Sequence, residues 1–375
     1  MIKVLHILTD TNIGGAGTLL VNYLKNFDRE KFLIKVILPM GSLMKPRVEA
    51  LGYEVIETNN LADKSMDVKG IFELMKIFKA EKPDIVHTHS SMSGKIAAYL
   101  TGVKSRIYTR HCAYEPPKYL TSFPGKQIIG FVNNTLSTHI VAVAEAAKEN
   151  LTDTGVDERK ITVIINGVEP LKMATAEEKA ETRRKYGIAD DDIVFGIVAR
   201  LEAVKGHKYY VEAAAEIVKE NPKAKFLIIG TGTEEDNLKK QVKELNIEEN
   251  VIFTGFITDV ASVINIMDIN VNCSYGTETS SLALSEGMSL KKPAIASIYG
   301  GNPYMITHGE NGLLCEKQNS KALFETMKVL MNDKEMREKM SETAYEHYKN
   351  KFTAEKMTKQ LEAIYEAETL KRKGK

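Results

Sequence analysis

Residues 271–288 read VNCSYGTETSSLALSEGM, and they carry the clearest structural pattern in the chain. The segment opens with apolar, β-prone residues and continues through a polar turn into an apolar spacing typical of a helix. Three residues of the turn are suitable helix caps: Thr277, Thr279 and Ser280. A strand, a short loop and a helix in this order indicate a βα unit of a parallel sheet, where ligands bind beside the carboxyl end of the strand.

Two carboxylates, Glu278 and Glu286, bracket this turn. If most of the segment between them is helical, they lie roughly 12 Å apart along its axis. Free amides at a helix N-terminus suit phosphate, so the segment fits a ligand that carries hydroxyl groups on both sides of a diphosphate. A structural role is equally consistent with this stretch alone, with Glu278 as a buried cap and Glu286 as an exposed helix residue.

The composition sets the limits of the interpretation. A chain of 375 residues predicts two domains of ordinary size. Because the 51 basic residues nearly balance the 50 acidic ones, the net charge gives no argument for nucleic-acid binding. The three cysteines are far apart, which excludes a disulfide framework and a zinc site and suits the cytoplasm. We expect no membrane-spanning segment and no signal peptide.

The first half alternates strands and helices, which predicts a doubly wound parallel sheet. The expected strands are residues 3–8, 32–38, 55–56, 84–87, 106–111, 140–143 and 161–165. The first strand runs into a turn with Gly14 and Gly15, followed by a helix from about Thr18. Such a turn can cradle a phosphate, but its spacing is not G-x-G-x-x-G, which disfavours an NAD-dependent oxidoreductase.

Histidines end two of these strands. His87 and His89 share one face of a strand, so a metal pair is conceivable, but no third ligand is nearby and hydrogen-bonding structural roles are favoured. His111 ends the next strand at the edge that faces any cleft. It either contacts a substrate or caps the core.

The segment 106–134 mixes basic and aromatic residues, which are Arg110, Lys118, Lys126, Tyr114, Tyr119, Phe123 and Phe131. A loop of this kind can rest on a membrane surface or hold an acceptor. The structural alternative is a loop with a half-buried aromatic patch.

The strand–helix pattern restarts after a polar connection at residues 169–186. Strands are expected at 193–198, 225–229, 251–253, 269–271 and 294–297, with a short edge strand after residue 309. Arg200 and Lys205 follow the first of these strands and can neutralise a leaving diphosphate, although a solvated loop is the alternative. The acidic run at 190–192 precedes its strand, at the wrong edge for a metal site. This argues for catalysis without a divalent ion.

Taken together, the sequence resembles the family 4 retaining glycosyltransferases with the GT-B fold (glycosyl transferases group 1). The resemblance covers nearly the whole chain and rests on motifs in the family's order, which are Gly14-Gly15, His111, Asn166-Gly167-Val168, Arg200 with Lys205-Gly206, and Glu278 with Glu286. It implies two Rossmann-like domains facing a cleft. Residues 1–168 would bind the acceptor and 169–350 the nucleotide-sugar, with the last helix, about 351–375, packing back on the first domain.

The resemblance also implies roles for single residues. The catalytic set is Arg200, Lys205, Glu278 and His111, with the two cations on the diphosphate and the other two on the sugar. Glu286 would bind the ribose. The full donor set is Gly14, Gly15, Ala16, Gly232, Phe256, Thr279, Ser280, Ser281, Leu282 and Glu286. The family usually has Gly-Phe-Gly in place of Thr279-Ser280-Ser281 and Glu in place of Tyr304, and both departures line the sugar pocket.

The implied activity is a retaining, metal-independent hexosyltransferase without a cofactor. It would move a sugar from a nucleotide diphosphate-sugar, with UDP favoured, to a saccharide or lipid-linked saccharide in cell-surface polysaccharide or glycoconjugate synthesis. The location would be cytoplasmic, with peripheral contact at the inner face of the membrane through 106–134, and no nucleic-acid partner. The alternatives are a nucleotide-sugar 2-epimerase on the same scaffold and a non-catalytic nucleotide-binding subunit.

Overall fold

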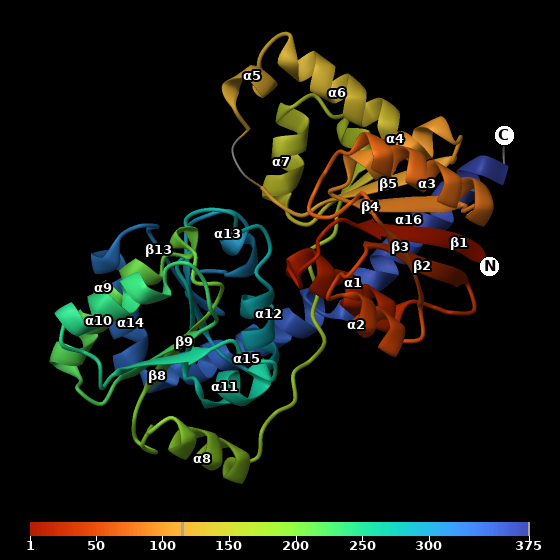
Figure 1. Cartoon of the computed structure of the whole chain (residues 1–375). Helices are drawn as coiled ribbons and strands as arrows, with labels where there is room; N and C mark the ends of the chain where they lie inside the picture. Colours follow the sequence, from red (N-terminus) through yellow and green to blue (C-terminus); the bar gives the residue numbers. More distant parts are fainter. Residues whose placement is uncertain (114–115, 374–375) are drawn as a thin grey trace. The chain divides into compact units, whose positions relative to one another are not determined.

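The computed structural model describes residues 1–113 and 116–373, and the chain divides into two compact units (Figure 1). The first unit comprises Met1–Val168 and the chain from Ala354 onward, and the second comprises Glu169–Thr353. Each unit is built around its own parallel sheet.

The first unit contains a seven-stranded sheet in the order β3-β2-β1-β4-β5-β6-β7, and all of its neighbouring strands are parallel. The inner strands β1 and β4 are largely buried, as expected for a sheet covered on both faces, and they carry the buried polar residues His6, His87 and His89 among apolar ones. The strands are β1 (Ile2–Leu8), β2 (Phe32–Pro39), β3 (Glu54–Thr58), β4 (Ile85–His89), β5 (Ser105–Arg110), β6 (His139–Ala142) and β7 (Ile161–Val163).

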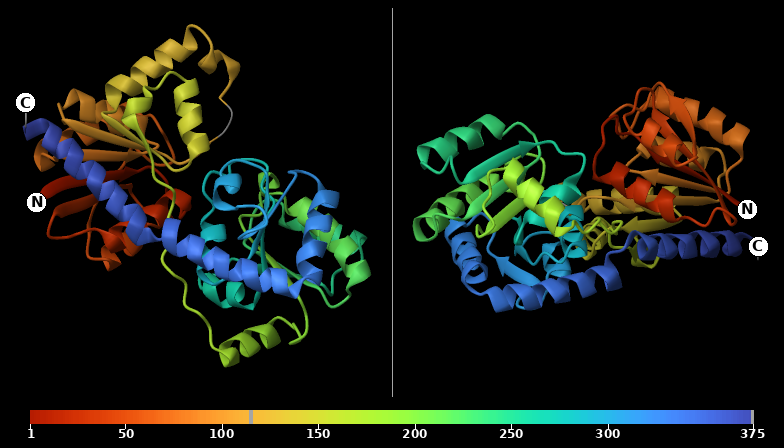
Figure 2. Two further views of the ribbon diagram at one scale, coloured as in Figure 1. Left: turned by 180° about the vertical axis from the view of Figure 1, so that it is seen from behind. Right: turned by 90° about the horizontal axis from the view of Figure 1, so that it is seen from below.

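Helices cover both faces of this sheet. One face packs against the C-terminal helix α16 (Ala354–Lys373), α1 (Gly15–Asn26) and α2 (Lys45–Ala50), and Figure 2 shows α16 as the dark blue helix that ends the chain. The other face packs against α3 (Val68–Glu81) and α4 (Met92–Leu100). The remaining helices of the unit are α5 (Lys118–Thr121), α6 (Gly125–Leu136), α7 (Glu145–Asp153) and the 3₁₀ turn η1 (Glu158–Lys160).

Two expectations about the helices of this unit were wrong. Helix α1 begins at Gly15 instead of about Thr18, because the first amides of a helix need no intrahelical acceptor and Gly14 can serve as its N-cap. The segment 118–136 forms α5 and α6 instead of a loop. Pro117 and Pro124 occupy the N-cap positions of these helices, where a missing N–H costs nothing.

The second unit contains a six-stranded parallel sheet in the order β10-β9-β8-β11-β12-β13. Its strands are β8 (Val194–Val198), β9 (Lys225–Ile229), β10 (Val251–Gly255), β11 (Ile269–Asn272), β12 (Ala294–Ser297) and β13 (Gly312–Cys315). Its helices are α8 (Ala176–Lys185), α9 (His207–Glu220), α10 (Glu235–Glu244), α11 (Val260–Ile266), α12 (Leu282–Ser289), α13 (Asn302–Met305), α14 (Ser320–Asn332) and α15 (Lys334–Lys351), with the 3₁₀ turn η2 (Ala203–Lys205).

Both sheets reverse their winding direction once. The reversal lies between β1 and β4 in the first unit and between β8 and β11 in the second. At such a switch point the loops that follow the two strands diverge, and a ligand can bind between them. Within the described ranges, no helix is both long enough and apolar enough to cross a bilayer.

Candidate active site

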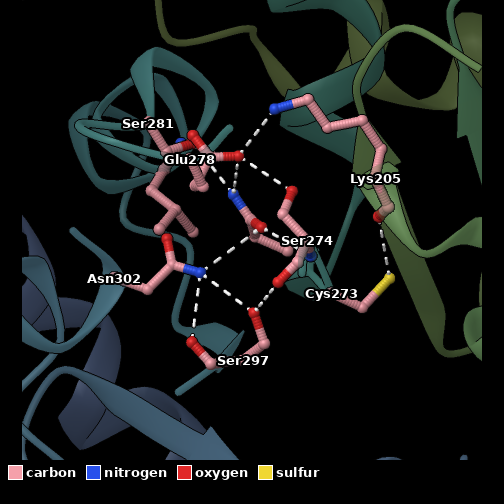
Figure 3. Close-up of polar contacts among 9 residues, drawn as sticks. Lys205, Cys273, Ser274, Glu278, Ser281, Ser297 and Asn302 are labelled. Atoms are coloured by element: carbon pink, nitrogen blue, oxygen red, sulfur yellow. Dashed lines mark hydrogen bonds and ion pairs between the residues drawn. The ribbon is translucent and has the colours of Figure 1, made fainter. Parts of the chain in front are cut away.

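The switch point of the second sheet brings Lys205 and Glu278 together. Lys205 ends η2 after β8, Glu278 lies in the loop after β11, and Lys205 Nζ is 2.9 Å from Glu278 Oε2 (Figure 3). Both side chains are nearly buried, at 14% and 10% exposed. Two backbone hydrogen bonds hold the loop after β8 against the loop after β11, since the amides of Tyr275 and Gly276 both donate to the carbonyl of Val204.

Two further donors converge on the same oxygen of Glu278. Ser274 Oγ donates at 2.8 Å and Asn272 Nδ2 at 3.3 Å, both to Oε2. Oε1 receives no hydrogen bond from the residues that the structure describes. One carboxylate oxygen is therefore held by the protein, and the other remains available to a ligand hydroxyl.

Further polar residues stabilise the loop that carries Ser274 and Glu278. Asn302 Nδ2 donates to the carbonyl and the hydroxyl of Ser297, each at 3.2 Å, and Ser297 Oγ donates to the carbonyl of Ser274 (Figure 3). The sequence reasoning did not assign Asn272, Ser274, Ser297 or Asn302 to the site. Asn272 and Ser297 are the last residues of β11 and β12, and Ser274 and Asn302 lie in the segments that follow these strands. Their place at the carboxyl edge of the sheet was the available signal.

Glycines 300 and 301 press against the loop that carries Glu278. A methyl group at Gly301 would lie 1.5 Å from the carbonyl oxygen of Thr279, and one at Gly300 would lie 1.8 Å from that of Glu278. The amide of Gly301 also donates to the Glu278 carbonyl at 3.3 Å. This backbone contact requires glycine at both positions.

We expect Gly301→Ala to destabilise the protein by about 2–4 kcal/mol and to lower activity at least tenfold, because the loop with Glu278 must move. The control is Gly309→Ala, where an added methyl meets no atom within 4 Å but the backbone φ is +87°. That strain should cost about 1–2 kcal/mol and leave activity intact. Urea unfolding and turnover of the two variants provide the measurement, and equal activity in both would contradict the assigned role of the contact.

Helix α12 begins later than the three proposed caps suggested. Ser281 is the N-cap, and its Oγ accepts from the amide of Leu284 at 3.3 Å, while Thr279 and Ser280 lie buried in the preceding loop. Glu278 is consequently outside the helix, so the helical spacing of roughly 12 Å does not apply between Glu278 and Glu286. Ser281 outcompetes the earlier candidates because its side chain also accepts from Asn272 Nδ2 at 3.1 Å.

Glu286 lies on α12 and is half-buried. Burial raises the pKa of its carboxyl to about 7, and its side chain has no hydrogen-bond or ion-pair partner within the described part of the chain. Burying a carboxyl group without a cation disfavours its ionised form. A carboxyl group kept in such a position is a candidate ligand-binding group. The alternative of an ordinary exposed helix residue does not fit this environment.

The other predicted residues of this unit lie along the same carboxyl edge. Arg200 is two residues beyond β8, is exposed, and its side chain bonds to no described residue. Gly232 packs against Leu201, since an added methyl would lie 2.4 Å from the Leu201 carbonyl. Phe256 follows β10 and is 70% exposed, but β9 separates its strand from β8. Leu282 opens α12. Binding roles for all four stay predictions.

In the first unit, Gly14 and Gly15 are exposed at the start of α1, and Ala16 is half-buried. His111 is the first residue after β5 and is half-buried. Its Nε2 lies 2.9 Å from Nδ1 of His89, and burial lowers the pKa of His111 to about 4. The structure describes each unit separately, so these residues stay predicted contacts of the donor.

The expectation that His87 and His89 lack a nearby third histidine was wrong. His6 of β1 joins them, because β1 is the direct neighbour of β4 in the sheet. The favoured role, hydrogen bonding, matches the contacts, since His6 Nδ1 is 3.0 Å from His89 Nε2. Sequence separation hid the partner, which lies 83 residues away.

The basic and aromatic segment is well exposed on α5, on α6 and in the turn between them. Tyr119, Phe123, Ile128 and Phe131 are 70%, 82%, 57% and 71% exposed, so the patch is not half-buried. Residues 116–144 contain Lys118 and Lys126 and no acidic residue. Tyr114, which was counted with this patch, lies outside the described residues.

Comparison with known proteins assigns both halves to glycosyltransferase families. The family described as Glycosyltransferase Family 4 matches residues 13–171, and Glycosyl transferases group 1 matches residues 178–347. The UDP-Gal:alpha-D-GlcNAc-diphosphoundecaprenol alpha-1,3-galactosyltransferase of Escherichia coli is 28% identical, over 97% of this chain and 96% of its own. The capsular polysaccharide biosynthesis glycosyltransferase CapM of Staphylococcus aureus is 27% identical, over 82% of this chain and 83% of its own.

A solved structure shares the fold of the whole chain. The crystal structure of Anabaena Alr3699/HepE in complex with UDP and glucose has a TM-score of 0.84 at 20% identity, and the match covers 97% of this chain and 99% of that one. The two parallel α/β sheets are therefore those of the GT-B fold. With both family matches and this fold, the chain belongs to the family 4, group 1 glycosyltransferases.

Proposed function

We propose that this glycosyltransferase moves a hexose-type sugar from a UDP-sugar to a lipid-linked saccharide, with retention of anomeric configuration and without a divalent metal. The observation that carries the proposal is the Lys205–Glu278 pair at the switch point of the second sheet. It places a cation for a diphosphate next to a carboxylate with one free oxygen for a sugar hydroxyl. The relatives named for UDP-galactose transfer and for capsular polysaccharide synthesis support the donor and the pathway class.

In the proposed reaction, the acceptor hydroxyl attacks the anomeric carbon from the face that the diphosphate leaves. The bond between the anomeric carbon and the phosphate oxygen breaks, the bond to the acceptor oxygen forms, and the leaving phosphate takes the acceptor proton. The transition state resembles an oxocarbenium ion. Lys205 and Arg200 stabilise the negative charge that grows on the diphosphate, as preorganised donors do elsewhere.

The charge arrangement supports metal independence. A magnesium site uses one or two free carboxylates with the substrate phosphates. Here Glu278 is already paired with Lys205, and burial of Glu286 disfavours its charged form. Two basic side chains after β8 instead supply the positive charge that a diphosphate needs.

The exposed aromatic patch on α5 and α6 supports a lipid-linked acceptor. Aromatic side chains flanked by lysines, with no acid from 116 to 144, suit an anionic membrane surface. An enzyme held there meets a lipid-linked acceptor directly.

The test is an assay of a UDP-sugar panel in the presence of EDTA. We expect transfer to a diphosphoprenyl-linked saccharide in anionic vesicles, faster than to the free saccharide, and NMR of the product should show the donor's anomeric configuration. Epimerisation of the donor without acceptor would favour the 2-epimerase. Nucleotide binding without turnover or hydrolysis would favour a non-catalytic subunit, and loss of transfer in EDTA would contradict metal independence.

The affinity for UDP should rise with pH through about 7. The ribose hydroxyls would donate to the ionised carboxylate of Glu286, whose pKa burial raises to about 7, so each pH unit below 7 weakens binding up to tenfold. In the ligand-free protein, the stability of the fold depends on pH in the opposite direction to UDP affinity. Burial favours the protonated form of Glu286 and raises its pKa from 4.5 to about 7. The contribution of Glu286 to stability is therefore fully present below pH 4.5 and is lost as the pH rises through 7.

Glu286→Gln provides the matched test. It should flatten the pH dependence of UDP affinity and raise the unfolding free energy of the ligand-free protein at pH 8 by roughly 3 kcal/mol. Calorimetric titration and urea unfolding between pH 5.5 and 8.5 measure the two effects. An identical pH profile in wild type and variant would remove Glu286 from the ribose site.

A further inference from the structure

A chain of buried polar side chains leads to His111 inside the first unit. The members come from β1, β4, β5 and α16, and each is at most 2% exposed. In order, they are Thr109, His87, Tyr365, His6 and His89.

The part of this chain nearest to His111 contains three imidazole rings. His111 Nε2 is 2.9 Å from Nδ1 of His89, and Nε2 of His89 is 3.0 Å from Nδ1 of His6. The rings of His89 and His111 are stacked, with centroids 5.1 Å apart. Nδ1 of His111 has no partner in the described ranges, so it remains for water or a ligand.

The far part runs through the C-terminal helix. Tyr365 OH lies 3.1 Å from Nε2 of His6 and 2.6 Å from Nδ1 of His87, and Nε2 of His87 lies 2.6 Å from Thr109 Oγ1. Every ring nitrogen of His6, His87 and His89 therefore has one partner.

Proton counting leaves two arrangements. Burial lowers the pKa of His6 to about 3 and holds those of His87 and His89 well below the ordinary value, so the rings are neutral at physiological pH. A neutral histidine has one N–H and one acceptor nitrogen. Each contact needs one donated proton, and each residue of the relay has one proton to donate. Either every residue donates to its neighbour on the side of His111, or every residue donates to its neighbour on the side of Thr109.

Thr109 decides between the two directions. Its hydroxyl is fully buried and contacts only Nε2 of His87 among the described polar groups. If the bonds pointed away from His111, the Thr109 proton would have no acceptor, which is unfavourable for a buried donor. The opposite direction satisfies it, and every ring then carries its proton on Nδ1.

We propose that this buried relay fixes His111 in the tautomer that presents an N–H at Nδ1, so that His111 donates a hydrogen bond to an oxygen of the bound sugar. Thr109, Tyr365 and the three buried histidines are positioning residues, because they act only through His111. The sugar as acceptor rests on the proposed function, whereas the tautomer rests on the contacts alone.

A metal site is the competing use of the same residues. Ligand nitrogens of His6, His87 and His89 lie within 4.8 Å of one another. Binding an ion would break several of the contacts above, whereas the relay keeps all of them. The hydrogen-bonded arrangement is therefore the favoured one, and the metal is an outcome of the test.

The test is ¹⁵N NMR of the histidine rings in the full-length, ligand-free protein, assigned with single-histidine variants. We expect Nδ1–H tautomers at His6, His87, His89 and His111. Thr109→Val removes the donor that sets the direction of the hydrogen bonds. The ratio of the Nδ1–H tautomer to the Nε2–H tautomer at His111 should then fall by roughly 5- to 150-fold. Thr109→Ser should restore it. Tyr23→Phe is the control, since it removes a buried hydroxyl of the same core that has no partner.

An Nε2–H tautomer at His111 in the wild type, or an unchanged tautomer in Thr109→Val, would overturn the proposal. So would a stoichiometric metal ion in the purified protein whose removal shifts the signals of His6, His87 and His89. Because the tautomer is measured without substrate, its result is independent of the proposed function. With the tautomer established, a donor KM that Thr109→Val leaves unchanged would exclude the sugar as the partner of His111.

Discussion

Lys205→Ala should lose turnover on the order of 10³-fold and about 3 kcal/mol of stability. The lysine is expected to bind the diphosphate, and loss of one preorganised donor at a developing negative charge costs 10²–10³ in rate. Its removal also leaves the nearly buried Glu278 carboxylate without its cation, 2.9 Å away in the native pair. Breaking such a pair on one side is strongly destabilising.

The double variant Lys205→Ala/Glu278→Gln separates the two effects. Removing both charges should return most of the lost stability, because no buried charge is left uncompensated. Activity should not return, since both the diphosphate contact and the carboxylate are gone. Urea unfolding and turnover of the four proteins in this cycle provide the measurement. Activity that recovers together with stability would show that the pair is purely structural.

Arg200→Ala should cost on the order of 3 kcal/mol in transition-state stabilisation, which appears as a 10²–10³-fold loss in kcat/KM. In contrast to Lys205, stability should hardly change, because the Arg200 side chain is exposed and bonds to no described residue. The guanidinium of Arg200 lies beyond the end of β8 and is available to donate hydrogen bonds to two phosphate oxygens at once.

Arg200→Lys should restore only part of this loss, since lysine keeps the charge but not the paired geometry. Arg184→Ala is the matched control, because Arg184 on α8 of the same unit is also exposed and its side chain bonds to no described residue. Steady-state kinetics with the preferred UDP-sugar decide the matter. Near-wild-type turnover in Arg200→Ala would contradict the assignment.

Much of the fold could be predicted because parallel strands carry their own signal. Continuous apolar runs bounded by glycine turns located the strands of both sheets to within a few residues. Because Lys205 and Glu278 each follow a predicted parallel strand, the sequence placed both at the carboxyl edge of the sheet. The structure makes the two strands neighbours and brings the side chains into contact.

What the sequence could not predict depends on contacts between distant segments. Nothing local distinguishes Ser281 from Ser280 as the cap, since the preference comes from Asn272 on β11. Asn302 acts through Ser297, a buried serine on β12. The segment that forms α5 and α6 was expected to be a loop, although the prolines before the two helices stand where a helix tolerates them.

We expect the basic side chains of the second unit to hold the diphosphate of the donor. Calorimetric titration with UDP and with uridine in EDTA tests it most directly, using the wild type, Arg200→Ala and Lys205→Ala/Glu278→Gln. We expect the wild type to bind UDP in EDTA, and both variants to bind UDP at least tenfold more weakly while their affinity for uridine stays unchanged. UDP affinity that is unaltered in both variants, or that the wild type loses in EDTA, would contradict it.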